Sequence, residues 1–439
     1  MNHAPLAALF LAMTLAAAEP RSSGVRAAQP AWSPPAGAIH VDPTHRADPK
    51  ADGSEAHPFA SLAKIRWRNG TTVVLRRGTV LETPAFRING ESLTLGAYGE
   101  GAPPVIRCTS EAKRGKNQHA IRVDSGPGLV LRDLDIHAPK GTSCLRLGGG
   151  KTTVSVLHCR IRGAAWGIRA FGFSGLQILD TEVHDIKDDG MFIVGVNDIE
   201  IGHCFVHDVN QNWKPPYTSQ KQAGGDAIQF VNCDRWRVHH CVLDRTNSGN
   251  KFCFISNNPK QKEGVFEHNL TRGPLTTGDG GSAIYMHDGD GLVVRYNTVL
   301  GPAPSMLYSH AANLRIYGNV CSGTSGGIFA SKSAEVYHNT FLGQQGYLVS
   351  GGKITAANNI FVLGKGTESA FGKVKALRED HNLQTQGNPG FVDAPKLDFR
   401  LRADSRCVGA GRQTPIRSDR LGTPIPTGPA PDLGAFERH

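Results

Sequence analysis

The 439-residue sequence predicts an all-β fold, a parallel β-helix in which short strands stack as the coils of a solenoid. Two observations carry this prediction. Gly and Pro are abundant, at 52 and 26 residues, whereas Met occurs only 5 times, which favours many turns over long helices. From residue 129 onward, segments with alternating apolar and polar residues recur mostly at intervals of about 20 to 28 residues, as the coils of a β-solenoid require.

The first 28 residues have the pattern of an export signal. An apolar run at residues 6–18 is followed by small residues, and it is too short to cross a bilayer. No later stretch is long enough for a membrane helix. We therefore expect residues 1–28 to be a leader and the mature protein to be secreted or periplasmic, with no membrane span.

Two terminal segments suggest how the solenoid is closed. The string AIHVDPTHRADPKADGSEAHPFASLAKI resembles the N-terminal segment of exported right-handed parallel β-helix proteins, which implies a short strand, a polar loop and a capping helix. The strings HNLQTQGNPGFVD, KLDFRLRADSRCVGAG and PDLGAFE resemble the closing segment of the same group, a final coil and an extended tail. The resemblance implies one right-handed parallel β-helix domain over residues 38–437, and we expect a monomer.

The repeat itself can be counted between the two ends. Ten comparable strands are each preceded by a second short strand, such as HAIRV or SCLRL, so each coil contains two or three strands and the stack has about ten or more coils. The ten strands start at Leu129, Val154, Leu176, Ile199, Trp236, Gly264, Leu292, Leu314, Glu335 and Ile354.

Two positions in the turn after these strands repeat along the stack. One carries Cys or Asn, and we interpret it as an inward ladder in which Asn side chains hydrogen-bond along the stack while Cys fills the same slot. This placement, the odd number of nine cysteines and the lack of a CxxC pair argue against a disulfide framework. The preceding position carries His158, His203, His240, His268 and His338. Because a zinc site needs three or four ligands that converge once, we interpret this column as a ladder also.

The outward position of the earlier strand in each coil suggests a binding surface. It begins with Arg and ends with aromatic residues, a plausible groove floor for an anionic sugar chain, although an ordinary mixed surface is the alternative. In order, the column reads Arg122, Arg146, Arg169, Phe192, Gln229, Phe254, Tyr285, Tyr308 and Phe329.

The net charge of +10 agrees with a polyanionic partner. The basic residues are scattered and not interleaved with aromatic residues on one short element, so we expect an acidic polysaccharide and no nucleic acid.

A column of charged residues suggests chemistry. Asp189, Asp226 and Lys251 lie two positions before the inward residue of three successive coils, and Asp188 adds a further carboxylate. Neighbouring coils are roughly 4.8 Å apart, so the carboxylates would repel one another unless a cation joins them, and hard oxygen ligands suit Ca²⁺. By parity this position points inward, however, so a buried ion pair between Asp226 and Lys251 is the alternative.

This column resembles the site of family-9 pectate lyases, in which an Asp cluster holds calcium and a Lys acts as base. The resemblance covers only Asp188, Asp189, Asp226 and Lys251, and the sequence lacks a further Asp where MFIV stands. It implies that a uronic-acid polysaccharide is cleaved by β-elimination, with Lys251 taking the proton next to a carboxylate that calcium neutralises.

A second possible centre needs no metal. Tyr285 and His287, followed one coil later by Tyr308 and His310, form outward Tyr-x-His pairs, and Arg169 lies in the Tyr column. A Tyr/His acid–base pair with an Arg to neutralise the uronate would perform the same elimination.

Other readings remain open. Glycoside hydrolysis would need a separated carboxylate pair such as Asp226 and Asp279, and exported β-helix proteins also include epimerases and unassigned proteins. A β-helix that only binds carbohydrate is the non-enzymatic alternative. In each case we expect sugar contacts from Gln229, Tyr308, His310 and Trp213, the last in the insertion NQNWKPPYTSQKQAGG.

Overall fold

The fold was taken from a computed structural model, which describes residues 32–45, 48–112, 118–124, 126–149, 153–209, 225–244, 251–256, 261–272, 282–301, 305–324, 326–343 and 346–438. For residues 251–256 only the backbone is described. The expected leader at residues 1–28 and Trp213 lie outside these ranges. All strands belong to the compact unit Ser33–His439.

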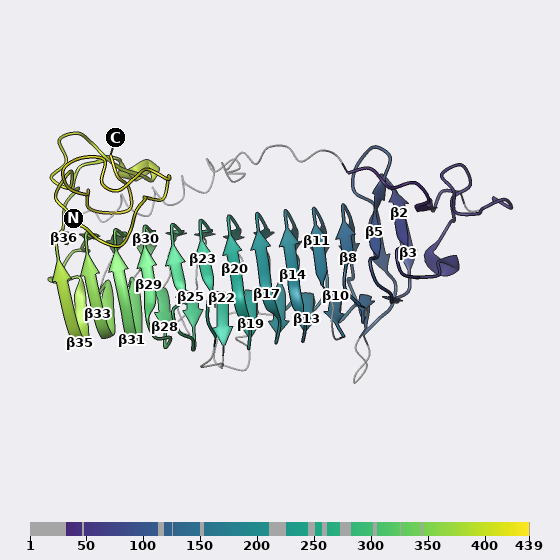
Figure 1. Cartoon of the computed structure of the whole chain (residues 1–439), viewed down its shortest axis with the longest axis horizontal. Coiled ribbons are helices and arrows are strands. Elements are labelled where there is room, and N and C mark those ends of the chain that lie inside the picture. Colours follow the sequence, from purple (N-terminus) through teal and green to yellow (C-terminus); the bar gives the residue numbers. More distant parts are fainter. Residues whose placement is uncertain are drawn as a thin grey trace, which may run out of the picture. The chain divides into compact units, whose positions relative to one another are not determined.

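Parallel strands of successive coils stack into three ladders (Figure 1). The first ladder contains β4 (Phe86–Ile88), β7 (His119–Val123), β10 (Ser143–Gly148), β13 (Trp166–Phe171), β16 (Met191–Val194), β19 (Asp226–Val231), β22 (Lys251–Ser256), β25 (Ser282–Met286), β28 (Ser305–Ser309), β31 (Ile328–Tyr337), β33 (Val349–Ala357) and β35 (Phe371–Asp380).

The second ladder follows the first within each coil. It contains β1 (Ile39–Val41), β2 (Thr72–Arg76), β5 (Thr94–Tyr98), β8 (Leu129–Arg132), β11 (Val154–Leu157), β14 (Ser174–Leu179), β17 (Asn197–Gly202), β20 (Asp234–His239), β23 (Val265–Glu267), β26 (Val293–Arg295) and β29 (Leu314–Tyr317), and it continues into the later halves of β31, β33 and β35.

The third ladder closes each coil. It contains β3 (Val80–Thr83), β6 (Val105–Cys108), β9 (Asp135–His137), β12 (Arg160–Arg162), β15 (Glu182–His184), β18 (Phe205–Val206), β21 (Val242–Asp244), β24 (Leu270–Arg272), β27 (Thr298–Leu300), β30 (Val320–Thr324), β32 (Thr340–Gly343), β34 (Ile360–Val362) and β36 (Leu383–Thr385).

The ladders form a parallel β-helix. Because β31, β33 and β35 each run through two ladders, the first and second ladders join into one 23-stranded sheet of the described residues, and the third ladder is a separate 13-stranded sheet. Inward side chains of each coil pack on those of the next, as Ile168, Met191 and Ile228 do with no exposed surface. Each such side chain contributes roughly 1.5–3 kcal/mol of burial energy. The register of the first ladder, predicted from Ile121 to Ile328, is confirmed.

The corner between the second and third ladders repeats one backbone conformation. Its first residue is left-handed in most coils, with φ between 49° and 59° at the non-glycine positions Asp133, His158, Asp180, His203, His240, His268, Tyr296, His338, Asn358 and His381. Asp, Asn and His are enriched among the non-glycine residues that adopt this conformation. The predicted His column therefore consists of residues that adopt the left-handed corner conformation, and it shares this position with Asp, Asn and Tyr.

The next residue of the corner forms the predicted inward ladder. Asn319 is typical: its Nδ2 donates to Val294 O at 2.9 Å and to Asn339 Oδ1 at 2.9 Å, and its Oδ1 accepts the backbone N–H of Asn297 at 2.9 Å. In earlier coils Cys241 fills this slot, with Sγ donating to His239 O at 3.3 Å. The ladder is confirmed, and the eight cysteines whose side chains are described are all free and buried.

Both ends are closed much as expected. At the N-terminal end β1 pairs with β2, but the expected capping helix is only the 3₁₀ turn η1 (Leu62–Lys64). After β36 the chain forms the antiparallel pair β37 (Phe391–Asp393) and β38 (Asp398–Leu401), with the 3₁₀ turn η3 (Ala394–Lys396) between them.

The C-terminal tail, yellow in Figure 1, runs back along the stack. Tyr296 Oη donates to Ser418 O at 3.0 Å, and the backbone N–H of Ala435 donates to Thr340 Oγ1 at 3.0 Å. The tail therefore covers the corner of several coils and not only the last one.

Candidate functional site

The outward residues of the first ladder form one continuous column. Pairing in the ladder places Arg122, Arg146 and Arg169 on successive coils, followed by Phe192 and then Gln229. The column continues through Phe254, Tyr285, Tyr308 and Phe329. Its backbone order is that predicted from the sequence.

The basic end of the column is partly neutralised by one acidic residue. Asp124 is ion-paired with Arg87 at 2.9 Å, with Arg146 at 3.0 Å and with Arg122. The three guanidinium groups keep a net positive charge after this pairing. Asp124 was not singled out from the sequence, although it lies two residues after Arg122 and therefore on the same outward face.

Arg169 occupies a different environment. Its guanidinium carbon lies 4.8 Å from the ring centroid of Trp166 and 5.0 Å from that of Phe171, and Phe192 lies on the next coil at 5.7 Å. The Nε atom is buried and makes no hydrogen bond to the described residues. Burial and Arg146 lower the pKa of Arg169, while Asp189 and Asp188 oppose this shift. The half-buried cation thus retains an unused donor.

The carboxylates of the Asp column are buried next to Trp166, whose ring packs on outward Arg169. Asp189 and Asp226 are only 6% and 7% exposed, and the backbone N–H of Asp226 donates to Asp189 Oδ1 at 2.7 Å. The Trp166 indole also donates to Asp189. Burial first, and then the Asp226 and Asp188 carboxylates, raise the pKa of Asp189 well above its usual value. Burial also raises the pKa of half-buried Asp188.

Lys251 follows the two carboxylates in register. The strand pairing sets Asp226 opposite Lys251, and the Lys251 side chain lies outside the described residues.

The donor set at this corner suits a hard cation chemically. Asp188, Asp189 and Asp226 supply carboxylate oxygens. Burial first, and then the repulsion between these carboxylates, raise the pKa of Asp189, and a divalent ion would relieve the repulsion. The same burial that raises this pKa leaves Asp189 and Asp226 little surface toward the outward column. These residues therefore fit an ion enclosed in the corner better than an ion shared with a sugar.

The aromatic end of the column forms a compact patch, which we call the Tyr/His patch: Tyr285, His287, Tyr308, His310 and Phe329. The Tyr285 and Tyr308 rings stack at 5.4 Å with an angle of 6°, and Tyr308 stacks on Phe329 at 4.6 Å. The ring centroids of Tyr285 and His287 are 6.3 Å apart. All five side chains are half-buried, so the patch is open to solvent.

Within the patch the two histidines differ. His310 Nδ1 is hydrogen-bonded to Ser331 Oγ at 2.9 Å, which fixes its ring. His287 Nδ1 has no hydrogen-bond partner among the described residues. Burial and the neighbouring Tyr308 raise the pKa of Tyr285. The patch thus pairs a phenol of raised pKa with an imidazole whose unpartnered Nδ1 is buried.

Arg169 and the Tyr/His patch do not share one sugar. Four coil steps separate Arg169 from Tyr285, which is roughly 19 Å at the usual strand spacing. The metal-free hypothesis required Arg169 to lie beside the Tyr/His pair. The structure does not bring these residues together. Gln229 lies midway, half-buried, two coils from each.

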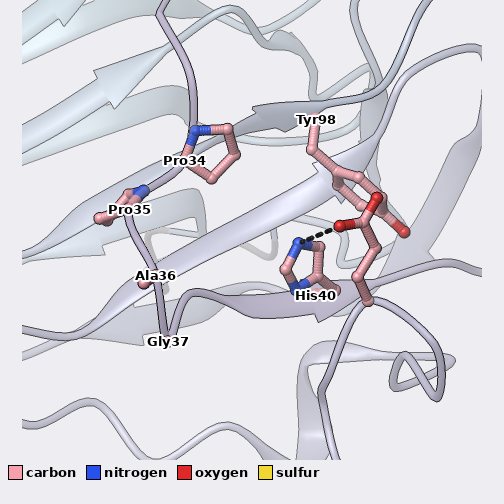
Figure 2. A pocket seen from close by; sticks show the side chains of 7 residues that line it. Pro34, Pro35, Ala36, Gly37, His40 and Tyr98 are labelled. Atoms are coloured by element: carbon pink, nitrogen blue, oxygen red, sulfur yellow. Dashed lines mark ion pairs between the residues drawn. The ribbon is translucent and has the colours of Figure 1, made fainter.

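A separate pocket lies at the N-terminal cap (Figure 2). In it His40 lies edge-on to Tyr98 at 4.6 Å and 4.0 Å from a Glu55 carboxylate oxygen, and burial is the main cause that raises the pKa of Tyr98 to about 12. Its residues belong to the cap and to β5, away from the outward column. The pocket, of about 330 Å³, is lined by Pro34, Pro35, Ala36, Gly37, His40, Glu55 and Tyr98.

Comparison with known proteins agrees with this architecture. The family model described as the right handed beta helix region matches residues 143–299. The solenoid is a right-handed parallel β-helix. A search of curated proteins found no match, and no described helix is long and apolar enough to cross a membrane.

Similar solved structures include enzymes that act on carbohydrates. The GH136 lacto-N-biosidase from Eubacterium ramulus is 15% identical, with 79% of this chain and 68% of that chain covered and a TM-score of 0.50. Pectate lyase Pel9A is 15% identical over 92% and 97% of the two chains, with a TM-score of 0.39. A rhamnogalacturonan lyase is 12% identical over 81% and 90%, also with a TM-score of 0.39. At these identities the similarity concerns the fold alone.

Proposed function

We propose that this protein is a polysaccharide lyase that binds an acidic polysaccharide along the outward column and cleaves it by β-elimination at the Tyr/His patch. The observation that carries the proposal is the patch itself: stacked rings for sugar faces, beside a phenol and an imidazole placed for proton transfer. It combines binding and acid–base groups on a surface open to solvent.

The reaction needs one base and one acid. The base removes the proton from C5 of a uronic acid, the C4–O bond to the preceding sugar breaks, and the acid protonates the leaving oxygen. A C4–C5 double bond remains in the product, so no water is consumed. This chemistry distinguishes elimination from hydrolysis.

The patch suggests the two roles. Tyr285 is the acid, because its raised pKa keeps the phenol protonated at neutral pH. His287 is the base, because its half-buried ring lies beside that of Tyr285 on the same outward face, with the two ring centroids 6.3 Å apart. Tyr308 and Phe329 extend the stacking surface, and His310, held by Ser331, contacts the sugar edge.

The basic part of the column binds other uronates of the same chain. Arg169 offers its half-buried guanidinium group to a carboxylate several sugars from the cleavage point, and Gln229 hydrogen-bonds hydroxyl groups between them. Nearer the patch, Lys332 lies 3.1 Å from Asp288, which directly follows His287. In this proposal Lys332 exchanges Asp288 for the carboxylate of the reacting uronate.

Calcium has a structural place in this proposal. Asp188, Asp189 and Asp226 would hold it, and it would supply charge neutralisation at the buried corner. Lys251 as base remains a second possible centre one coil from Tyr285, since Cys253 pairs with Ile284.

Hydrolysis is the second candidate function. Burial raises the pKa of half-buried Asp188, a property of a general acid that protonates a glycosidic oxygen. The hydrolases among the similar folds are consistent with this reading.

The test uses a panel of uronic-acid polymers with calcium or with chelator. Ultraviolet absorbance of the unsaturated product and the number of reducing ends are followed together. The proposal expects both to rise in parallel, with activity retained in chelator. Reducing ends without absorbance would establish the hydrolase, and no change in either signal would leave only binding.

A further inference from the structure

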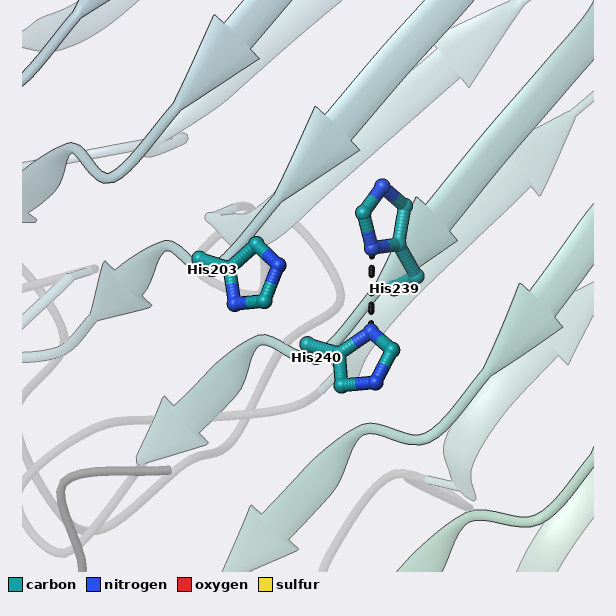
Figure 3. A group of neighbouring side chains, drawn as sticks. All are labelled: His203, His239 and His240. Atoms are coloured by element: carbon teal, nitrogen blue, oxygen red, sulfur yellow. Dashed lines mark hydrogen bonds between the residues drawn. The ribbon is translucent and has the colours of Figure 1, made fainter. Parts of the chain in front are cut away.

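Three histidines meet at the corner between the second and third ladders (Figure 3). His203 follows β17, and His239 and His240 lie at the end of β20 and directly after it. One ring nitrogen of each lies within 4.8 Å of the others. In Figure 3 a ring nitrogen of His203 points toward the other two residues.

Two of the three belong to the corner column and one does not. His203 and His240 have φ of 55° and 53°, and their rings stack at 4.9 Å. His240 stacks equally on His268 of the next coil, at 4.8 Å. His239 is instead the last residue of a strand and is only 6% exposed, with Nδ1 3.0 Å from His240 Nδ1. His203 and His240 alone would be two neighbours in the stacked column. With His239 added, three imidazole rings meet at one point of the stack.

A glycine gives the His239 ring its position. Gly202 is the ladder partner of His239, and a Cβ atom there would lie 2.5 Å from His239 Cε1 and 2.6 Å from Nε2. The φ of Gly202 is not left-handed, so the backbone does not require glycine at this position. Only a residue without a side chain leaves room for the imidazole.

A carboxylate fixes the proton of His239. Glu200 Oε1 lies 3.2 Å from His239 Nε2, and Gln177 Nε2 donates to Glu200 Oε2 at 2.9 Å. With Nε2–H donated to Glu200, the lone pair of His239 is on Nδ1, facing His240. Histidines that bind metals have this second partner almost always.

We propose that His203, His239 and His240 form a binding site for a transition-metal ion of the Zn²⁺ class, with one coordination position left open. Imidazole ligands favour Zn²⁺, Ni²⁺ and Cu²⁺ over Ca²⁺, and three protein ligands with an open position are typical of exchangeable zinc sites. The site lies on a different corner from the Tyr/His patch, and it does not depend on the proposed lyase activity.

The chemistry of binding requires only small changes. Tetrahedral zinc places its nitrogen ligands roughly 3.3 Å apart, so side-chain rotations bring the three nitrogens into place. The His240 proton moves to Nε2, which frees Nδ1 for the ion. Arg237, the nearby cation, is ion-paired with Glu267 at 2.5 Å.

The test is Zn²⁺ titration calorimetry of the full chain without a polyhistidine tag. His203→Asn removes one ligand, and His268→Asn is the matched control, because both residues are left-handed corner residues that stack on His240. Asn accepts this backbone conformation. We expect His203→Asn to weaken Zn²⁺ binding at least about tenfold and Glu200→Gln to weaken it about 10- to 100-fold. His268→Asn should stay within about twofold.

The absorption spectrum of the Co²⁺-loaded wild type gives a second readout that needs no variant. Intense visible bands of four-coordinate cobalt support the site. Absence of Zn²⁺ binding by the wild type would overturn the proposal, as would equal losses in His203→Asn and His268→Asn. If His203→Asn does not fold, Glu200→Gln decides, and unchanged affinity in that variant would also contradict the proposal.

Discussion

Removal of the Tyr285 hydroxyl tests the proposed acid directly. Tyr285→Phe keeps the ring that stacks on Tyr308 at 5.4 Å, so the binding surface is retained while the proton donor is lost. General acid catalysis contributes about 10²- to 10⁴-fold. We therefore expect kcat to fall at least about 100-fold, which corresponds to about 2.7 kcal/mol of transition-state stabilisation, with KM nearly unchanged.

The matched control is Tyr308→Phe, which removes the same hydroxyl one coil later. The Tyr308 ring lies between Tyr285 and Phe329 and serves only for stacking in this account, so kcat should stay within about threefold. The assay is the initial rate of ultraviolet absorbance on the best polymer of the panel. A Tyr285→Phe enzyme with wild-type kcat, or equal losses in both variants, would refute the assignment.

Three further predictions concern the ladder, the buried carboxylates and pH. Asn319→Ala leaves the buried N–H of Asn297 without its acceptor and should destabilise the fold by about 2–5 kcal/mol, visible as a lower urea midpoint; an unchanged midpoint would contradict the ladder's role. Because the pKa of Asp189 is raised on folding, its charge destabilises the folded state above the unfolded pKa, and stability increases as pH falls toward that value. In chelator at neutral pH, Asp189→Asn should thus melt no lower than wild type, and calcium should raise only the wild-type melting temperature. Finally, the raised pKa of Tyr285 places the alkaline limb of the kcat/KM profile above pH 10, and a limb near neutrality would exclude the phenol as acid.

The sequence predicted most of the fold because each coil repeats the same physical requirements. Inward residues from Ile121 to Ile328 could be aligned by their period of two, and the Asn ladder by its fixed place in the corner. The prediction of a capping helix was wrong, because this segment forms only a single 3₁₀ turn.

The order of residues along the candidate site could be predicted from the sequence, but the burial of their side chains could not. Counting coils gives the column that holds Arg169 and Tyr285, yet the same count already separates them by four steps, so they do not meet. Parity left open whether Asp189 faces the groove or the core, and only packing shows that it is buried with a hydrogen bond from Trp166.

The sequence pattern did not identify His239 as a neighbour of the His column, for a different reason. His239 lies beside the His column and not in it, so its contact with His203 depends on the ring orientation that Gly202 permits. No period in the sequence encodes such an orientation. The interpretation of the column as a ladder was sound for His268, whereas His203 and His240 have an additional neighbour.

The central claim is that the outward column of this β-helix cleaves an acidic polysaccharide by elimination. The most direct measurement compares a uronic-acid polymer with the same polymer after its carboxyl groups have been reduced to alcohols, in ultraviolet absorbance and in reducing ends. Elimination needs the carboxylate beside C5, so absorbance and reducing ends should rise together with the native polymer and neither should rise with the reduced one. New reducing ends without absorbance, from either polymer, would contradict the account.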